Sequence, residues 1–224
     1  MTSLQDRQGV VPLHAGSLDS FPAEKYESVA AYFSGYLDAT AKAATSIEAS
    51  ALDEAGEILL TAYLHSATVF SCGNGGSAAI ANHLQCDHLK GVRTATDLTP
   101  RVVSLSSNVE LLTAIANDSS YEEVFAYQLQ SQAKPGDVLM AISSSGNSPN
   151  IVQALTWARE HGLRTIALTG FDGGAAKGLA DVVIHVDGAN YGIVEDQHQA
   201  IMHALAQYIR HSRMTTDVII SSVF

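Results

Sequence analysis

The chain divides into two stretches with different hydrophobic rhythms. In residues 23–63, apolar side chains recur mostly three or four positions apart and no proline interrupts them, which predicts a pair of amphipathic helices. Beyond residue 66 the apolar residues form short continuous runs rich in valine, isoleucine and leucine, each bounded by glycine, proline or polar turns. These runs, which we interpret as strands, are ATVFSC, PRVVSL, GDVLMAIS, RTIALTG and DVVIHV.

The strand-like runs alternate with helical patterns such as SPNIVQALTWAREHG. Continuous apolar strands separated by helices are typical of a parallel sheet covered on both faces, so the chain is predicted to be α/β. Residues 1–22 are turn-rich and are expected to form an arm with little order of its own. Residues 23–212 are expected to form one domain, which includes the N-terminal helices and a last helix over residues 194–210. Residues 213–224 are expected to form a tail against a partner subunit.

Composition limits the function classes. With 46% hydrophobic and 16% charged residues, the 224-residue chain can bury a full core. No apolar run approaches the roughly 18 residues of a membrane span and the N-terminus lacks a signal pattern, so we expect a soluble, cytoplasmic protein. Cys72 and Cys86 are interpreted as reduced residues rather than a disulfide framework. The net charge of −11 argues against a nucleic-acid partner.

Two strand-to-helix turns carry the functional signal. The first, in FSCGNGGSAAIANHLQCDH (residues 70–88), is rich in glycine, so its backbone N–H groups can surround an anion at the positive end of the next helix. In the second, AISSSGNSPNIVQAL, four serines crowd around one glycine, which is more than a helix cap requires. The carboxyl ends of parallel strands form one crevice, so both turns are predicted to face one phosphate.

A dinucleotide site is the alternative for the first turn. Gly73, Gly75 and Ala78 fit the pattern G-x-G-x-x-A. No acidic residue ends the next strand-like run, RVVSL, where a ribose would need one, and Glu110 comes too late. The dinucleotide interpretation is therefore disfavoured.

The helices after the turns carry residues suited to acid–base or metal chemistry. His83 and Asp87 are four residues apart and share one helix face, a spacing suited to chelating one ion, although a histidine on such a face is more often a packed core residue. Glu195 and His203 are eight residues apart, roughly 12 Å of helix rise. They meet one ion only if Glu195 stands at the helix entrance and the two side chains lean together.

The order and spacing of these motifs resemble the sugar isomerase (SIS) domain family, and within it the phosphoheptose isomerase group. The motifs are CGNGGSAA with the following histidine and aspartate, AIANDSSYEEVF, GDVLMAISSSGNSPN, ALTGFDGG and VEDQHQAIMHAL. The resemblance covers residues 23–210. It implies a single SIS domain with a five-stranded parallel sheet flanked by helices, and a homotetramer whose active sites draw on more than one subunit. The implied activity interconverts sedoheptulose 7-phosphate and D-glycero-D-manno-heptose 7-phosphate through an enediol.

The resemblance also implies roles for individual residues. Asp87 and His203 match the acid–base pair, which moves a proton between neighbouring carbons. Four positions match a metal site that holds zinc in some members: His83, Asp87, Glu195 and His203. The positions implied to bind substrate are Asn74, Gly75, Ser77, Asp118, Ser143, Ser144, Ser145, Ser148 and Glu195. The alternative for Asp118 is a turn-forming residue.

Three positions depart from the family pattern. Asp87 replaces a glutamate and is one methylene shorter, Glu195 replaces a glutamine and adds a negative charge, and Gly91 stands where a basic residue is expected, with Lys90 and Arg93 beside it. These changes leave an octose 8-phosphate isomerase of a biosynthetic cluster as an alternative. A non-catalytic SIS protein, either binding a replication initiator or sensing a sugar phosphate, is a second alternative, disfavoured because both acid–base residues are present.

Overall fold

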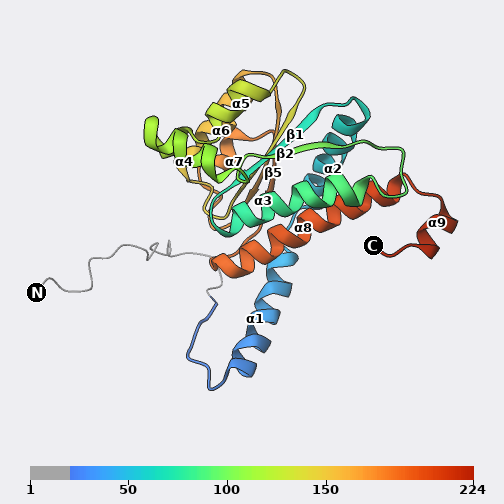
Figure 1. The fold of residues 1–224 in the computed structure, drawn as a ribbon. Helices are drawn as coiled ribbons and strands as arrows, with labels where there is room; N and C mark the ends of the chain where they lie inside the picture. The colour runs from blue at the N-terminus through green and yellow to red at the C-terminus, as the bar shows by residue number, and fades with distance from the viewer. Residues whose placement is uncertain (1–20) are drawn as a thin grey trace, which may run out of the picture.

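A computed structural model describes residues 21–224 and confirms the predicted α/β fold with its five-stranded parallel sheet (Figure 1). The strands lie in the order β2-β1-β3-β4-β5, and each pairs in parallel with its neighbours. Their bounds fall within or one residue beyond the five predicted runs. They are β1 Thr68–Gly73, β2 Arg101–Ser104, β3 Val138–Ser143, β4 Arg164–Thr169 and β5 Val182–His185.

Helices cover both faces of the sheet, because successive strand residues point to opposite sides. Met140 and Ile142 of β3 pack with α2, α3 and α8, whereas Leu139 and Ala141 pack with α4, α5 and α6. All six residues of β3 are buried, as expected for a central parallel strand. The α-helices are α1 Val29–Ala44, α2 Ala49–Leu64, α3 Gly76–Cys86, α4 Val109–Asp118, α5 Ala126–Gln132, α6 Pro149–Glu160, α7 Ala176–Leu179, α8 Tyr191–Ser212 and α9 Thr216–Ser221.

The strand order places a topological switch point between β1 and β3. The chain leaves β1 toward β2 on one side and enters β3 on the other, so the loops after β1 and β3 diverge at the carboxyl edge of the sheet. Ligands in open α/β sheets bind in the crevice at such a point. The two turns that the sequence singled out are these two loops.

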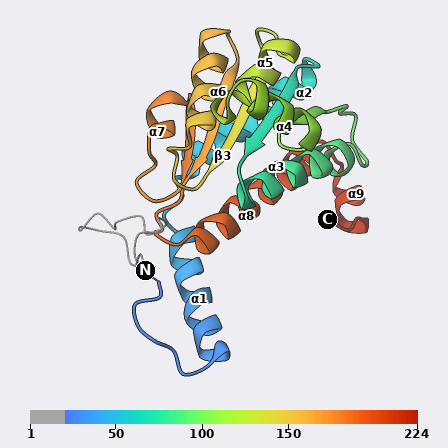
Figure 2. The same cartoon turned by 60° about the vertical axis from the view of Figure 1, so that its left-hand side comes forward.

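The N-terminal helix α1 projects from the body of the molecule (Figure 2). It is tied to α8 by the Tyr36 hydroxyl, which donates a 2.7 Å hydrogen bond to Asp196 Oδ2. Residues 1–20 of the predicted arm lie outside the described residues. Phe21 packs against Tyr32 and Tyr36, and its carbonyl accepts a hydrogen bond from Asn190.

The C-terminal tail forms the short helix α9 and then returns to its own chain. Arg210 donates to the Val223 carbonyl, and its guanidinium lies 4.7 Å from the centroid of the Phe224 ring. The predicted contact of the tail with a partner subunit stays a prediction. Over residues 21–224, none of the helices has the length and apolar character that crossing a membrane requires.

Candidate active site

A pocket of about 140 Å³ lies at the switch point of the sheet. Three helices begin beside it: α3 at Gly76, α6 at Pro149 and α8 at Tyr191. Because free N–H groups give a helix N-terminus a partial positive charge, three such ends around one small pocket favour an anion. The pocket is lined by Asn74, Ser77, Ile142, Ser143, Ser144, Ser145, Ser148, Tyr191 and Glu195.

The serines of this pocket differ in what their hydroxyls already bind. Ser143 Oγ accepts from the Gly146 N–H at 3.2 Å and Ser145 Oγ accepts from the Asn147 N–H at 3.3 Å, so both stabilise their own loop. The buried Ser144 hydroxyl has no partner among the described residues. Ser148 is the N-cap residue of α6, yet its side chain makes no capping hydrogen bond. The Ser144 and Ser148 hydroxyls therefore have no protein partner within residues 21–224, whereas Ser143 and Ser145 keep only their O–H donors for a ligand.

Two glycines with positive φ shape the loops around the pocket. Gly75 has φ +55° and leaves the Gly-rich turn open at the start of α3. Gly146 has φ +64°, and a Cβ at this position would collide with the carbonyl oxygen of Gly173 in the loop after β4. The serine loop therefore lies directly against the loop that follows β4.

A hydrogen-bond network that the sequence did not predict fixes Asn74. Its amide exchanges two hydrogen bonds with the buried Asn150 of α6, at 2.9 and 3.0 Å, and its Oδ1 also accepts from the Tyr121 hydroxyl at 2.9 Å. The network ties together the loop after β1, the start of α6 and the 3₁₀ turn Tyr121–Glu123. An asparagine on the buried face of a helix start was the available signal for Asn150, and nothing local pointed to Tyr121.

Of the predicted acidic residues Asp118 and Glu195, only Glu195 lines the pocket. Asp118 is exposed at the end of α4, where its carboxylate accepts from the side chain of Asn117 and does not line the pocket. The Glu195 carboxylate lines the pocket and lies against the first turn of α3, since a Cβ on Gly76 would collide with it. Burial, together with the neighbouring Asp196 carboxylate, raises the pKa of Glu195.

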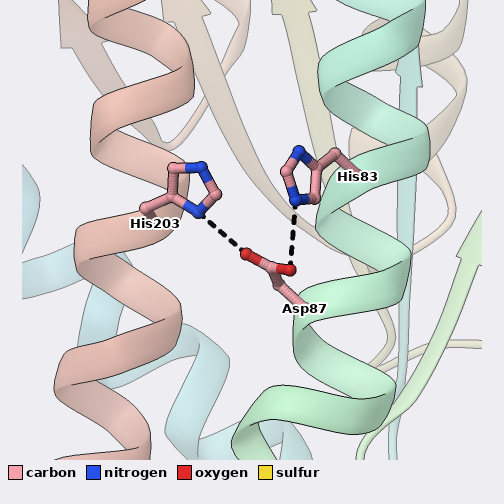
Figure 3. Close-up of side chains that lie close together, drawn as sticks. All are labelled: His83, Asp87 and His203. Carbon is pink, nitrogen blue, oxygen red and sulfur yellow. Dashed lines mark hydrogen bonds and ion pairs between the residues drawn. The ribbon is translucent and has the colours of Figure 1, made fainter. Parts of the chain in front are cut away.

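Three predicted residues converge further along the two helices: His83 of α3, Asp87 directly after α3, and His203 of α8 (Figure 3). Asp87 Oδ2 lies 2.8 Å from His203 Nδ1, and Asp87 Oδ1 lies 3.2 Å from His83 Nε2. Ligand atoms of the three residues lie within 4.8 Å of one another. Glu195, the fourth predicted metal ligand, does not belong to this group and lies about 12 Å of helix rise from His203.

Gln199 joins the group from α8 and was not predicted. Its side-chain nitrogen lies 3.2 Å from His83 Nδ1 and 2.9 Å from His203 Nε2. Its position four residues before His203, on the same helix face, was the available signal. The amide thus fixes both imidazole rings from the side opposite to Asp87.

Helices α3 and α8 run side by side in the same direction, which explains the pairing of distant residues. Glu195 of α8 lies against Gly76, Gln199 against His83, and His203 against Asp87. The anion pocket therefore stands where both helices begin, and the Asp87–His203 pair stands about three turns further along.

Comparison with known proteins agrees with this geometry. A family model described as the SIS domain matches residues 32–170, more than half of the chain. The chain belongs to the SIS domain family. A phosphoheptose isomerase from Colwellia psychrerythraea is 39% identical over 170 residues, which cover 75% of this chain and 86% of that protein.

Two solved SIS structures are also similar. A phosphoheptose isomerase from Neisseria gonorrhoeae superposes with a TM-score of 0.74 at 32% identity, and the match covers 82% of this chain and 97% of that one. A phosphoheptose isomerase from Francisella tularensis gives a TM-score of 0.75 at 27% identity, with 82% and 96% of the two chains covered. The relationship therefore extends over almost the whole length of these isomerases.

Proposed function

We propose that this SIS protein is a phosphosugar isomerase that interconverts sedoheptulose 7-phosphate and D-glycero-D-manno-heptose 7-phosphate. The observation that carries the proposal is the 2.8 Å contact between Asp87, which directly follows α3, and His203 of α8, because α3 and α8 both begin at the anion pocket. The relatives named above are phosphoheptose isomerases. They give no support to the octose, initiator-binding or sensing alternatives.

In this proposal the phosphate lies in the anion pocket. The free hydroxyls of Ser144 and Ser148, the Ser77 side chain and the N–H groups of Gly75 and the following turn bind its oxygens. Ser143 and Ser145 hold the loop that presents these groups. Asn74 orients the first loop through its network, and Asp118, one turn before Tyr121, contacts sugar hydroxyls at the rim.

The separation between the two ends favours a long sugar. A phosphate beside Glu195 must be joined to a carbonyl carbon near His203, on the order of 12 Å further along α8. A short sugar phosphate does not span this distance, whereas an extended seven-carbon chain fits it better. The phosphate is therefore bound at one end of the site, and the proton transfers at the carbonyl take place at the other end.

The acid–base pair supplies the two proton transfers that aldose–ketose isomerisation requires. The Asp87 carboxylate removes the proton from C1 of the ketose, which gives an enediol, and returns it to C2. The His203 imidazole moves the accompanying proton between the oxygens on C2 and C1, so that the aldose forms with no net gain or loss of protons. Its 2.8 Å contact with Asp87 keeps the ring oriented.

The cluster of His83, Asp87 and His203 fits a divalent cation. Two imidazoles and one carboxylate form a donor set typical of catalytic zinc, and their ligand atoms lie within 4.8 Å of one another. We propose one zinc ion per subunit at these residues; when bound, it would polarise a substrate oxygen as a Lewis acid. For Glu195 to become its fourth ligand, the Glu195 side chain has to turn away from the anion pocket.

We further propose a cytoplasmic homotetramer. The projecting helix α1 presents Val29, Phe33 and Leu37 at a spacing of four residues, and these side chains are 86%, 58% and 50% exposed. An apolar stripe of this kind is typical of a helix that packs against another subunit. Light scattering of the purified protein tests the assembly, and a monomer would contradict it.

The activity is tested by incubating the protein with sedoheptulose 7-phosphate in deuterated water, with added zinc or with a chelator, followed by NMR of the sugar. We expect an aldose to appear and deuterium to enter next to the carbonyl, faster with zinc. Protection of the fold against heat without exchange would favour a sensor. The absence of both exchange and protection would contradict the proposed function.

A further inference from the structure

One residue breaks the apolar stripe of α3 and its continuation. The buried face of this segment carries Ile80, Leu84, His88 and Val92, four residues apart, and His88 is fully buried between apolar neighbours. Its Nε2 has no hydrogen-bond partner among the described residues. A buried ring nitrogen without a partner destabilises a fold, and leucine at this position would avoid that cost. The imidazole therefore needs an explanation other than core packing.

The other ring nitrogen of His88 has one specific partner. The hydroxyl of Tyr63, in the last turn of α2, lies 2.5 Å from His88 Nδ1, and both side chains are buried. Burial lowers the pKa of His88 to about 4 and raises that of Tyr63, so the pair is neutral at physiological pH. This contact is a directional hydrogen bond between α2 and the segment after α3.

The segment that carries His88 is a π-helix. It spans Asp87–Val92 and begins at the residue that meets His203. A π-helix is wider than an α-helix, and single π turns within helices are frequent at functional sites. The wide turn directs Asp87 toward α8 while His88, the next residue, points into the core against α2.

Asp87 needs such control because aspartate has a short side chain. Its two oxygens reach His203 at 2.8 Å and His83 at 3.2 Å, so the backbone at residue 87 must stand close to both imidazoles. An apolar residue at position 88 would bury equally well but would tolerate sliding of the turn, whereas a hydrogen bond fixes both distance and direction.

We propose that Tyr63 and His88 are positioning residues that pin the π-helical turn and thereby hold the Asp87 carboxylate against His203 and His83. The proposal rests on the isomerase function proposed above. Neither residue contacts the substrate; both act through the backbone of Asp87.

Three variants test the pair. Tyr63→Phe removes one hydroxyl and keeps the ring, His88→Leu restores the apolar stripe, and His88→Asn keeps a polar atom near the position of Nδ1. We expect kcat to fall about tenfold in Tyr63→Phe and His88→Leu with KM within about twofold, because the carboxylate shifts while the anion pocket stays intact. His88→Asn is expected to keep kcat within about threefold of the wild type.

Zinc affinity, measured by titration calorimetry without substrate, gives a second readout. We expect Tyr63→Phe and His88→Leu to weaken zinc binding about tenfold, His88→Asn to retain it, and the exposed control Tyr127→Phe to leave both quantities unchanged. A role confined to stability would lower only the temperature of unfolding. Wild-type kcat and zinc affinity in Tyr63→Phe would overturn the proposal.

The two proposals fail in distinguishable ways. A wild-type protein that binds zinc but turns over no sugar contradicts the isomerase function, and the zinc affinities still decide whether the pair positions Asp87. If His88→Leu does not fold, Tyr63→Phe, which removes a single oxygen atom, decides the question.

Discussion

The two ends of the α3–α8 pair are built from different groups. At the start of the helices, the anion pocket consists of serine hydroxyls, glycine turns and backbone N–H groups at the carboxyl edge of the sheet. About three turns along, the proposed proton-transfer end consists of the Asp87 and His203 side chains with His83 and Gln199 around them.

This difference predicts how each end responds to mutation. Many donors share the binding of an anion, so the loss of one hydroxyl weakens binding only in part. Proton transfer depends on two side chains at one distance, so the loss of either removes the reaction. Mutations near the start of α8 are therefore expected to change mainly the affinity for substrate, and mutations near His203 mainly the rate.

The largest effect is expected from His203→Ala. Without the imidazole, kcat should fall at least about a thousandfold, while the affinity for sugar phosphate stays within about tenfold because the phosphate contacts lie elsewhere. Deuterium exchange followed by NMR measures the rate, calorimetry measures the affinity, and the exposed His211→Ala serves as control. Equal losses of rate and affinity would mean that His203 holds the whole site together.

Acid is expected to destabilise the fold and, with it, both ends of the site. His198 is buried in α8, between Glu195 and His203 along the helix. Burial lowers the pKa of His198 from 6.5 to about 4, so the unfolded chain binds a proton that the folded chain does not. The free energy of unfolding should fall as the pH drops through this interval. His198 accounts for on the order of 2 kcal/mol of this fall at pH 5, and the buried His88, whose pKa is lowered in the same way, adds its own contribution. Urea titrations between pH 7 and pH 5 measure it, and a slope unaffected by His198→Leu would refute the assignment.

A smaller effect is expected from Ser144→Ala. The substitution removes an unpartnered hydroxyl from the anion pocket, so KM for sugar phosphate should rise about tenfold while kcat is maintained. Steady-state kinetics check this, with the exposed Ser131→Ala as control. A fall in kcat at constant KM would break the proposed division between the two ends.

The smallest effect is expected from Glu195→Gln. This variant tests whether Glu195 belongs to the anion pocket or to the metal site. Its carboxylate lies in the anion pocket, so removing the negative charge should lower KM about threefold. Zinc affinity is measured in parallel. If it falls more than about tenfold while KM is unchanged, Glu195 belongs to the metal end as the resemblance implied.

Much of the fold was predictable because its signals are local. The run GDVLMAIS became the central strand β3, and the periodicity of residues 23–63 became α1 and α2. The π-helix was not predictable, since its sequence reads as a continuation of α3. The role of His88 was missed for the same reason, although its position in the stripe with Leu84 and Val92 was available.

The candidate site shows the same difference between local features, which were predictable, and long-range contacts, which were not. Asp87 and His83 share one helix face, which their spacing of four residues predicted. The pairing of Asp87 with His203, 116 residues later, and of Asn74 with Asn150, 76 residues later, depends on which helices lie side by side. Glu195 illustrates the opposite case, because its spacing to His203 left its location open and the packing of α8 on α3 put it beside Gly76.

The sequence by itself determined the class of fold, the five strands, the two ligand turns and the residue types able to do the chemistry. These follow from periodicity and turn chemistry, which act over a few residues. Tertiary structure alone decided that three helices begin at one pocket, that the buried Ser144 hydroxyl has no partner among the described residues, and that Tyr63 meets His88. Such contacts arise when distant elements bury their apolar faces together, and no local pattern encodes which polar groups are then left facing one another.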